Sequence, residues 1–181
     1  MKNTLNIHRA LVVIDMQNDF ITGSLGTKEA QKILPNVSKK LHLETVKGTD
    51  LFFTMDTHDI NYLNTLEGKK LPVEHCIINT PGWAIYKDLA NYISCAKDII
   101  HKSTFGSFEL ADKLGEYNEV ELIGLCTDIC VISNAIIIKN KYPNTTVIVD
   151  ASCCAGVTPA SHLAALQTMK MCQVDIIGEV K

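Results

Sequence analysis

Three side chains that could share one chemical task lie at the ends of separate apolar segments. Asp15 ends ALVVID, Lys102 ends IIHK, and Cys130 follows VELIGL after a short turn. A thiol at the start of a helix lies near free amides and the positive end of the helix dipole, which lower its pKa. In an open α/β sheet, chemistry gathers at the carboxyl ends of the strands. The pattern predicts a catalytic triad of Asp15, Lys102 and Cys130.

In this triad Asp15 would accept the thiol proton, while Lys102 would stabilise the thiolate of Cys130. Attack on an amide carbonyl also needs oxyanion donors, and the backbone N–H groups of Cys126 and Cys130 are the candidates. Each side chain alone has a commoner explanation. Buried cysteines are mostly inert, aspartates cap helices, and strand-end lysines are solvated. Their joint placement after three strands favours the catalytic interpretation.

A second group of residues has the composition of a metal site. Asp56 and His58 follow another apolar segment two positions apart, so an extended chain points both side chains the same way. Together with His75 they offer a carboxylate and two imidazoles, a set suited to Zn²⁺, Mn²⁺ or Fe²⁺ with open positions. Glu67 is a possible fourth ligand. The alternative is that both histidines are loop residues with local hydrogen bonds.

Four apolar residues near these strand ends could line a slot for a flat ring: Phe20, Leu71, Phe105 and Phe108. Core packing is an equally good explanation for them. The adjacent Cys153 and Cys154 are most simply small buried side chains.

Apolar, β-branched segments alternate with helix-length segments along the chain, which is typical of βαβ units. Strands are expected at 9–15, 51–55, 98–102, 120–125, 145–150 and 174–177. Helices are expected at 28–47, 84–92, 108–114, 128–141 and 159–171, the last with Thr158 as its N-cap. The region 57–83 has no clear periodicity, and a loop of that length favours a functional role. We expect one domain, residues 1–181, with a three-layer α/β/α sandwich around a six-stranded, mainly parallel sheet.

The amino-acid composition limits the kinds of binding partner and the cellular compartment that we expect. The chain has 17 basic and 20 acidic residues and a formal charge of -3, mixed along its length, which disfavours nucleic acid and favours a small-molecule substrate. The N-terminal apolar segment is too short to span a bilayer. Seven cysteines, an odd number, fit reduced thiols better than a disulfide framework. We expect a cytoplasmic protein without membrane contact. Apolar positions along 131–138 favour a homo-oligomer.

Five motifs resemble those of the isochorismatase-like cysteine hydrolase superfamily and, within it, those of nicotinamidases. They occur in the family's order and span most of the chain: VVIDMQNDF, DTH, HCIINTPG, HKSTFGSF and GLCTDICV. The resemblance implies that Asp15 is the general base, Lys102 the third triad member and Cys130 the nucleophile. It places one divalent metal ion, with zinc favoured over manganese or iron, on Asp56, His58 and His75, with Glu67 as the fourth ligand.

The same resemblance implies strand order 3-2-1-4-5-6 and a non-proline cis peptide at Leu125–Cys126, where the Cys126 amide would belong to the oxyanion hole. Two positions depart from the nicotinamidase pattern. Ile129 stands where a histidine often precedes the nucleophile, and Leu71 or Pro72 stands near where an aromatic residue often covers the ring. The amide chemistry is therefore better supported than the substrate.

The leading hypothesis is hydrolysis of nicotinamide to nicotinate and ammonia for NAD salvage, through a thioester on Cys130. The alternative within the superfamily is hydrolysis of another small amide or a ureido compound; ether hydrolysis of isochorismate is disfavoured by Cys130 and the DTH motif. A third hypothesis is a non-catalytic binding or redox-sensing protein; a sensor would form a Cys126–Cys130 disulfide or one that involves Cys153.

Overall fold

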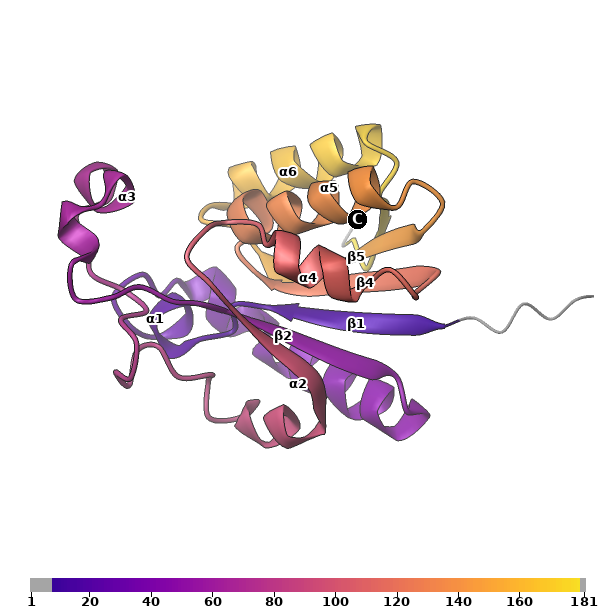
Figure 1. Ribbon diagram of the computed structural model, residues 1–181, viewed down its shortest axis with the longest axis horizontal. Coiled ribbons are helices and arrows are strands. Elements are labelled where there is room, and N and C mark those ends of the chain that lie inside the picture. Colours follow the sequence, from indigo (N-terminus) through magenta and orange to yellow (C-terminus); the bar gives the residue numbers. More distant parts are fainter. Residues whose placement is uncertain (1–7, 180–181) are drawn as a thin grey trace, which may run out of the picture.

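The computed structural model describes residues 8–179, which build a six-stranded parallel sheet between two layers of helices (Figure 1). The strand order is β3-β2-β1-β4-β5-β6, so the predicted architecture and order are confirmed. The strands are β1 (Arg9–Ile14), β2 (Asp50–Asp56), β3 (Ala96–Lys102), β4 (Glu119–Leu125), β5 (Thr146–Ala155) and β6 (Asp175–Ile177). The single-domain boundary of 1–181 stays a prediction, since its first seven and last two residues lie outside the described part.

The helices divide between the two faces of the sheet. The long α2 (Lys28–Lys47) covers one face, and the other face carries α4 (Phe108–Lys113), α5 (Ile132–Lys141) and α6 (Pro159–Met171) (Figure 1). Short α1 (Asn18–Ile21) follows β1. Within residues 8–179, no helix combines the length and the apolar character needed to cross a membrane.

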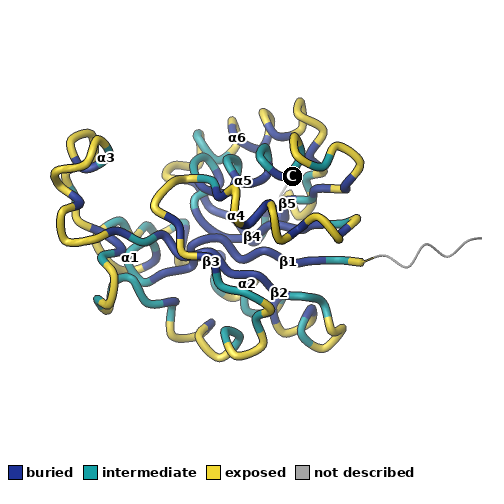
Figure 2. Tube along the Cα trace, viewed as in Figure 1, coloured by how far each residue is buried: buried dark blue, intermediate teal, exposed yellow. Residues whose placement is uncertain are grey.

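Side chains along the central strands point alternately to the two faces of the sheet, and each face has its own hydrophobic core. Val12 and Ile14 of β1 pack with the layer of α4, α5 and α6, while Leu11 and Val13 pack toward α2. All four are fully buried, as the dark inner strands of Figure 2 show. Because successive strand side chains point to opposite faces, a strand covered on both sides is apolar throughout. This is why β1 is a continuous apolar segment.

Helix boundaries follow capping chemistry that the sequence already contains. Thr27 accepts a hydrogen bond from the amide of Ala30 at the start of α2, and Gly48 ends that helix with φ of +74°. Thr158 caps α6 with Pro159 at the first position, as predicted, and forms a capping box with Ser161.

The prediction of a helix at 84–92 was wrong. This segment lies against the end of β1, where Ile85 forms a bridge with Gln17 and the amide of Tyr86 donates to the carbonyl of Met16 at 2.9 Å. Its backbone groups are thus used by tertiary hydrogen bonds instead of a helix. Only the short 3₁₀ segment η2 (Ala90–Cys95) follows.

Three further segments differ from what the sequence led us to expect. The region 57–83 contains η1 (Tyr62–Asn64) and α3 (Leu66–Lys70), which together form a lobe that projects from the sheet (Figure 1). Strand β5 continues to Ala155, so Cys153 and Cys154 lie within the strand and not after it. The helix predicted from Asp128 begins with a π-helical turn, η3 (Thr127–Val131), before α5.

An ionic cluster at the α2 face is a feature that the periodicity did not predict. Glu121 of β4 has no solvent exposure and pairs with Arg9 and with Lys40, the latter at 2.6 Å. Lys40 also pairs with Asp150 at 2.8 Å, and Arg9 with Glu44 at 2.8 Å. These contacts join α2 to β1, β4 and β5. Each buried carboxylate has a cation, without which its burial would be costly.

Candidate active site

Four neighbouring strands deliver the predicted site residues to one edge of the sheet. Lys102 and Asp56 are the last residues of β3 and β2, and they are paired in the register. Asp15 directly follows β1, and Cys130 lies in η3 after β4. Because the sheet is parallel, all these carboxyl ends meet at the same edge, next to the point between β1 and β4 where the strand order reverses.

The predicted triad residues are in direct contact. Lys102 Nζ lies 2.6 Å from Oδ2 of Asp15 and 3.6 Å from the sulfur of Cys130. The side chain of Asp15 has no solvent exposure and that of Lys102 only 2%. Lys102 therefore bridges a carboxylate and a thiol in a dry environment, where its charge is screened far less than at a surface.

Thr54 positions the carboxylate of Asp15, a role that the sequence analysis missed. Its hydroxyl donates to Oδ1 of Asp15 at 2.6 Å, and the backbone amide of Asp15 donates to the carbonyl of Thr54 at 3.2 Å. Asp15 has a φ of +48°, an uncommon backbone conformation that aspartate tolerates better than most residues. A threonine within an apolar strand gave no signal beyond its β propensity.

The protonation states differ from one sequence-based expectation. Helix-start amides were expected to lower the pKa of Cys130, yet burial, together with the nearby carboxylate of Asp15, raises that pKa well above its usual value. Burial also raises the pKa of Asp15, against the opposing charge of Lys102. Burial alone would lower the pKa of Lys102, but its interactions with Asp15, Cys130 and Asp56 outweigh burial and raise this pKa. Burial thus favours the neutral thiol of Cys130, while the charge of Lys102 favours the carboxylate of Asp15.

The end of β4 turns sharply toward this group. Gly124 has a φ of +117°, and a Cβ there would collide with the carbonyl oxygen of Ile14. The Leu125–Cys126 peptide is cis, as the resemblance implied. Among the described residues no acceptor takes the Cys126 amide, whereas its carbonyl accepts from Ile129 and Val131. The free amide and the thiol of Cys130 belong to one turn.

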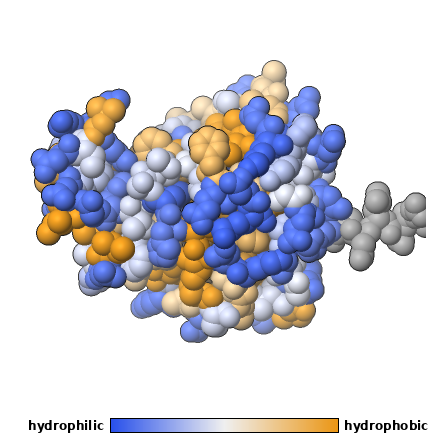
Figure 3. Space-filling view, in the orientation of Figure 1, coloured by the Kyte–Doolittle hydropathy of each residue, from blue (hydrophilic) through white to orange (hydrophobic). Residues whose placement is uncertain are grey.

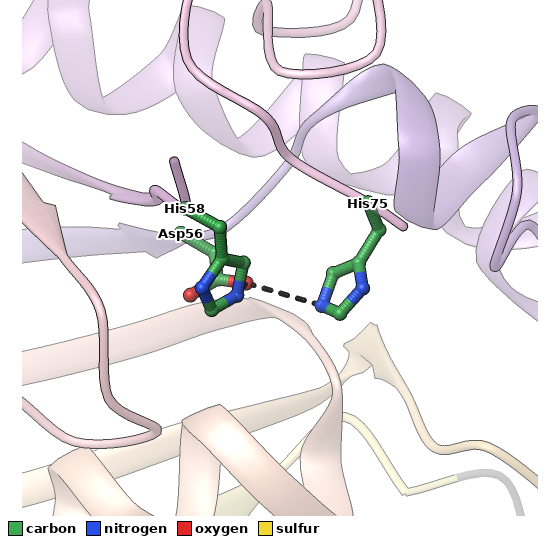
Figure 4. Close-up of side chains that lie close together, drawn as sticks. All are labelled: Asp56, His58 and His75. Carbon is green, nitrogen blue, oxygen red and sulfur yellow. Dashed lines mark hydrogen bonds and ion pairs between the residues drawn. The ribbon is translucent and has the colours of Figure 1, made fainter. Parts of the chain in front are cut away.

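The predicted metal ligands also converge. Nε2 of His58 lies 3.0 Å and Nε2 of His75 lies 3.5 Å from Oδ2 of Asp56, and all three residues are buried (Figure 4). Glu67 comes within 3.9 Å of His75 Nε2 and is more exposed. The other carboxylate oxygen of Asp56 lies 3.6 Å from Lys102 Nζ. Asp56 thus connects the histidine cluster with the triad.

The surroundings of this cluster fit a divalent cation. Nδ1 of His75 donates to the carbonyl of Val73 at 2.8 Å, which orients the ring with Nε2 toward Asp56. Gln17 fixes the backbone of Asp56 by accepting from its amide at 2.7 Å and donating to its carbonyl at 2.8 Å. Burial alone would raise the pKa of Asp56, but hydrogen bonds with both histidines and the charge of Lys102 hold it below its usual range. The pKa of Asp56 thus favours its carboxylate, and both imidazoles are buried beside it.

A cavity of about 60 Å³ joins the two groups of residues. Asp56, His75, Cys126 and Cys130 line its polar end, and its apolar walls are Phe20, Leu25, Leu71, Phe105 and Ile129. Three of the four residues expected to form an apolar slot are therefore present. Phe108 does not line this cavity, because it starts α4 and leaves its side chain 74% exposed.

Comparison with known proteins identifies the family that this chain resembles. The profile of the Isochorismatase domain matches residues 9–179. The chain is 26% identical to the nicotinamidase/pyrazinamidase of Mycobacterium tuberculosis, over 93% of this chain and 98% of that protein. It is 30% identical to a probable inactive nicotinamidase of Arabidopsis thaliana, covering 89% and 87% of the two chains. The crystal structure of the pyrazinamidase of Pyrococcus horikoshii in complex with zinc superposes with a TM-score of 0.78, at 28% identity and coverage of 95% and 99%.

The fold and the strand-end cluster define a parallel α/β hydrolase with a cysteine at its centre. The chain belongs to the isochorismatase family. Its relatives place it, within that family, beside the nicotinamidases, which act on carboxamide C–N bonds, and this part of the sequence-based prediction is confirmed.

Removing either imidazole should reduce metal binding. We expect His58→Ala and His75→Ala to bind zinc at least about tenfold more weakly than wild type, because each removes one of few buried ligands. Zinc content after dialysis against a graded chelator measures this directly. His42→Ala, on the exposed side of α2, is the matched control. Equal zinc retention in all three variants would contradict the site.

Proposed function

We propose that this protein is a metal-containing cysteine amidohydrolase that converts nicotinamide to nicotinate and ammonia. The observation that carries the proposal is the contact of Lys102 with Asp15, Cys130 and Asp56 at distances of 2.6 to 3.6 Å, beside a metal-type cluster and one shared cavity. Cys130, Asp56 and His75 line this cavity, and Lys102 connects them with the buried Asp15. This is the constellation expected for acyl transfer from a small amide.

In the proposed first half-reaction, Asp15 takes the proton of the Cys130 thiol as the sulfur attacks the carboxamide carbon. The raised pKa of Asp15 makes its carboxylate a stronger base than a solvated aspartate. Lys102 supplies positive charge next to the developing thiolate. The developing oxyanion is assigned to the backbone amides of Cys126 and Cys130.

Collapse of the tetrahedral species breaks the C–N bond. The proton held by Asp15 passes to the leaving nitrogen, ammonia departs, and the acyl group remains on Cys130 as a thioester. Asp15, again a carboxylate, then removes a proton from water as the water oxygen attacks the thioester. The C–S bond breaks, the acid departs, and the proton held by Asp15 returns to the sulfur of Cys130. The net reaction consumes one water and yields one carboxylic acid and one ammonia.

The proposed metal holders are Asp56, His58 and His75, with Glu67 as a fourth ligand. A divalent ion there, zinc in our proposal, would supply a Lewis-acid position for a ring nitrogen of the substrate and for water. Around it, Gln17 fixes Asp56 and the carbonyl of Val73 orients His75. Phe20 stacks obliquely on His75, with ring centroids 5.6 Å apart, and provides an apolar wall for a flat ring.

A different small amide or ureido compound is the alternative substrate. Family membership alone does not decide this, because one relative is named as a probable inactive nicotinamidase. Leu71 and Ile129, which line the cavity, are aliphatic in this chain. Recognition of an aromatic ring is therefore less well supported than hydrolysis of an amide. The three-residue contact of Asp15, Lys102 and Cys130 favours an active enzyme.

The cellular setting belongs to the same proposal. All seven cysteines are free thiols, as expected in a reducing compartment, and we place the protein in the cytoplasm. Its product, nicotinate, would feed NAD salvage. Assembly into a homo-oligomer, which we expected from the sequence, is also part of this proposal.

The proposal is tested by ammonia release from nicotinamide after reconstitution with zinc, manganese or iron. We expect release by wild type and at least about a thousandfold loss in Cys130→Ala, because no other group replaces the nucleophile. Zinc content and far-UV circular dichroism should match those of wild type. Comparable ammonia release by folded, metal-loaded Cys130→Ala would refute the nucleophile assignment.

The pH profile tests the role of Thr54. Activity needs the Asp15 carboxylate, so kcat/KM should fall as pH drops through the raised pKa of Asp15. The Thr54 hydroxyl lowers this pKa through its hydrogen bond, so Thr54→Val should move the acidic limb upward by about one pH unit. Thr54→Ser keeps the hydroxyl and should retain the wild-type limb. If the pH profiles of kcat/KM for Thr54→Val and Thr54→Ser coincide, the role assigned to the Thr54 hydroxyl is wrong.

A further inference from the structure

A second, larger cavity opens directly from the catalytic one. It has a volume of about 430 Å³ and shares four lining residues with the catalytic cavity, namely Glu67, Leu71, Phe105 and Ile129. Because these residues line both spaces, the two are neighbouring compartments of one recess. We call the larger compartment the distal groove.

Two separate segments form the sides of the distal groove. Leu66, Lys70 and Leu71 come from α3 and its end, while Thr104 and Phe105 come from the loop that follows β3. The lobe that carries α3 stands away from the sheet, and Figure 3 shows apolar side chains on its surface. Leu66 and Phe105 are 72% and 51% exposed. The groove is therefore open to solvent along its length, and its inner end is the cavity with Cys130.

The two volumes differ in what they can hold. Ligand pockets for small molecules usually measure about 300–1,000 Å³, and a cavity of roughly 150 Å³ suffices for benzene. The catalytic cavity, at about 60 Å³, is too small to enclose more than one aromatic ring. The groove, at about 430 Å³, has room for more than one aromatic ring. A single-ring amide would leave much of it filled by water.

The chemistry of the groove walls favours an uncharged, apolar occupant. Its two charged lining residues, Glu67 and Lys70, have opposite signs. The hydroxyl of Thr104 is already committed, since it donates to the carbonyl of Gly106 at 2.8 Å. Ser103 adds one further hydroxyl, and the remaining walls, Leu66, Leu71, Phe105 and Ile129, are aliphatic or aromatic. Burying apolar substrate surface here would contribute about 25 cal/mol per Å².

We propose that the distal groove is a second substrate subsite, which binds an apolar substituent of the scissile carboxamide. The substrate class then extends beyond single-ring amides to aromatic carboxamides that carry a second ring. This inference rests on the proposed amidase function. The carboxamide lies at Cys130, its own ring passes between Leu71 and Phe105, and the substituent lies along α3 beside Leu66.

The test compares nicotinamide with 5-phenylnicotinamide and 6-phenylnicotinamide as substrates of the metal-reconstituted enzyme. We expect at least one phenyl amide to have a kcat/KM no lower than that of nicotinamide. In Leu66→Asp, a charge in the groove should lower the ratio of phenyl amide to nicotinamide kcat/KM roughly tenfold. Ile60→Asp is the matched control, because Ile60 is equally apolar, 82% exposed on the same lobe and absent from both cavity linings. It should leave the ratio unchanged.

Two results would overturn the subsite while leaving the proposed function intact. One is hydrolysis of nicotinamide with rejection of both phenyl amides, and the other is an equal change of the ratio in Leu66→Asp and Ile60→Asp.

If nicotinamide itself is not hydrolysed, the proposed function fails, and calorimetric binding to the Cys130→Ala protein then decides the subsite. Tighter binding of a phenyl amide than of nicotinamide, lost when Leu66→Asp is added, supports it. Equal or undetectable binding refutes it.

Discussion

The arrangement of this protein depends on one buried ion pair, that between Lys102 and Asp15. The two groups lie 2.6 Å apart with almost no solvent access, so removing either would leave a charge uncompensated in the interior. The same ammonium also reaches the sulfur of Cys130 and the carboxylate of Asp56 at 3.6 Å each. The proposed nucleophile, the proposed base and the candidate metal site are therefore electrostatically linked through a single cation. A change at any of these groups is expected to alter the others.

The topology of the sheet makes this ion pair possible. Lys102 ends β3 and Asp15 follows β1; these strands are not neighbours, and β2 lies between them with Asp56 in register with Lys102. On the other side of β1, Gly124 allows β4 to approach the carbonyl of Ile14, which no residue with a Cβ could do without displacing the backbone. The π-helical turn after β4 then brings Cys130 toward the same edge. The order 3-2-1-4 thus supplies, side by side, the four strand ends that the proposed chemistry needs.

Local sequence was enough to predict what depends on periodicity and capping, and the resemblance supplied the strand order. Residues such as Asp15 and Lys102 end clear apolar strands, so their convergence followed from a parallel sheet. Features set by tertiary contacts were not accessible. The segment 84–92 is helical by pattern but bonds to the end of β1, and Thr54 shows its role only beside Asp15. Likewise, burial and the carboxylate of Asp15 raise the pKa of Cys130, and both depend on the three-dimensional surroundings.

The most direct test of the central claim is to trap the covalent intermediate. Metal-loaded protein would be acid-quenched during turnover of nicotinamide, digested and examined by mass spectrometry. The account predicts a nicotinoyl group on the peptide that contains Cys130, attached to that sulfur and absent from Cys126 when the two are resolved by fragmentation. Nicotinate production without any acylated cysteine, or acylation of Cys126 in place of Cys130, would contradict the assigned nucleophile and the organisation of the site around Lys102.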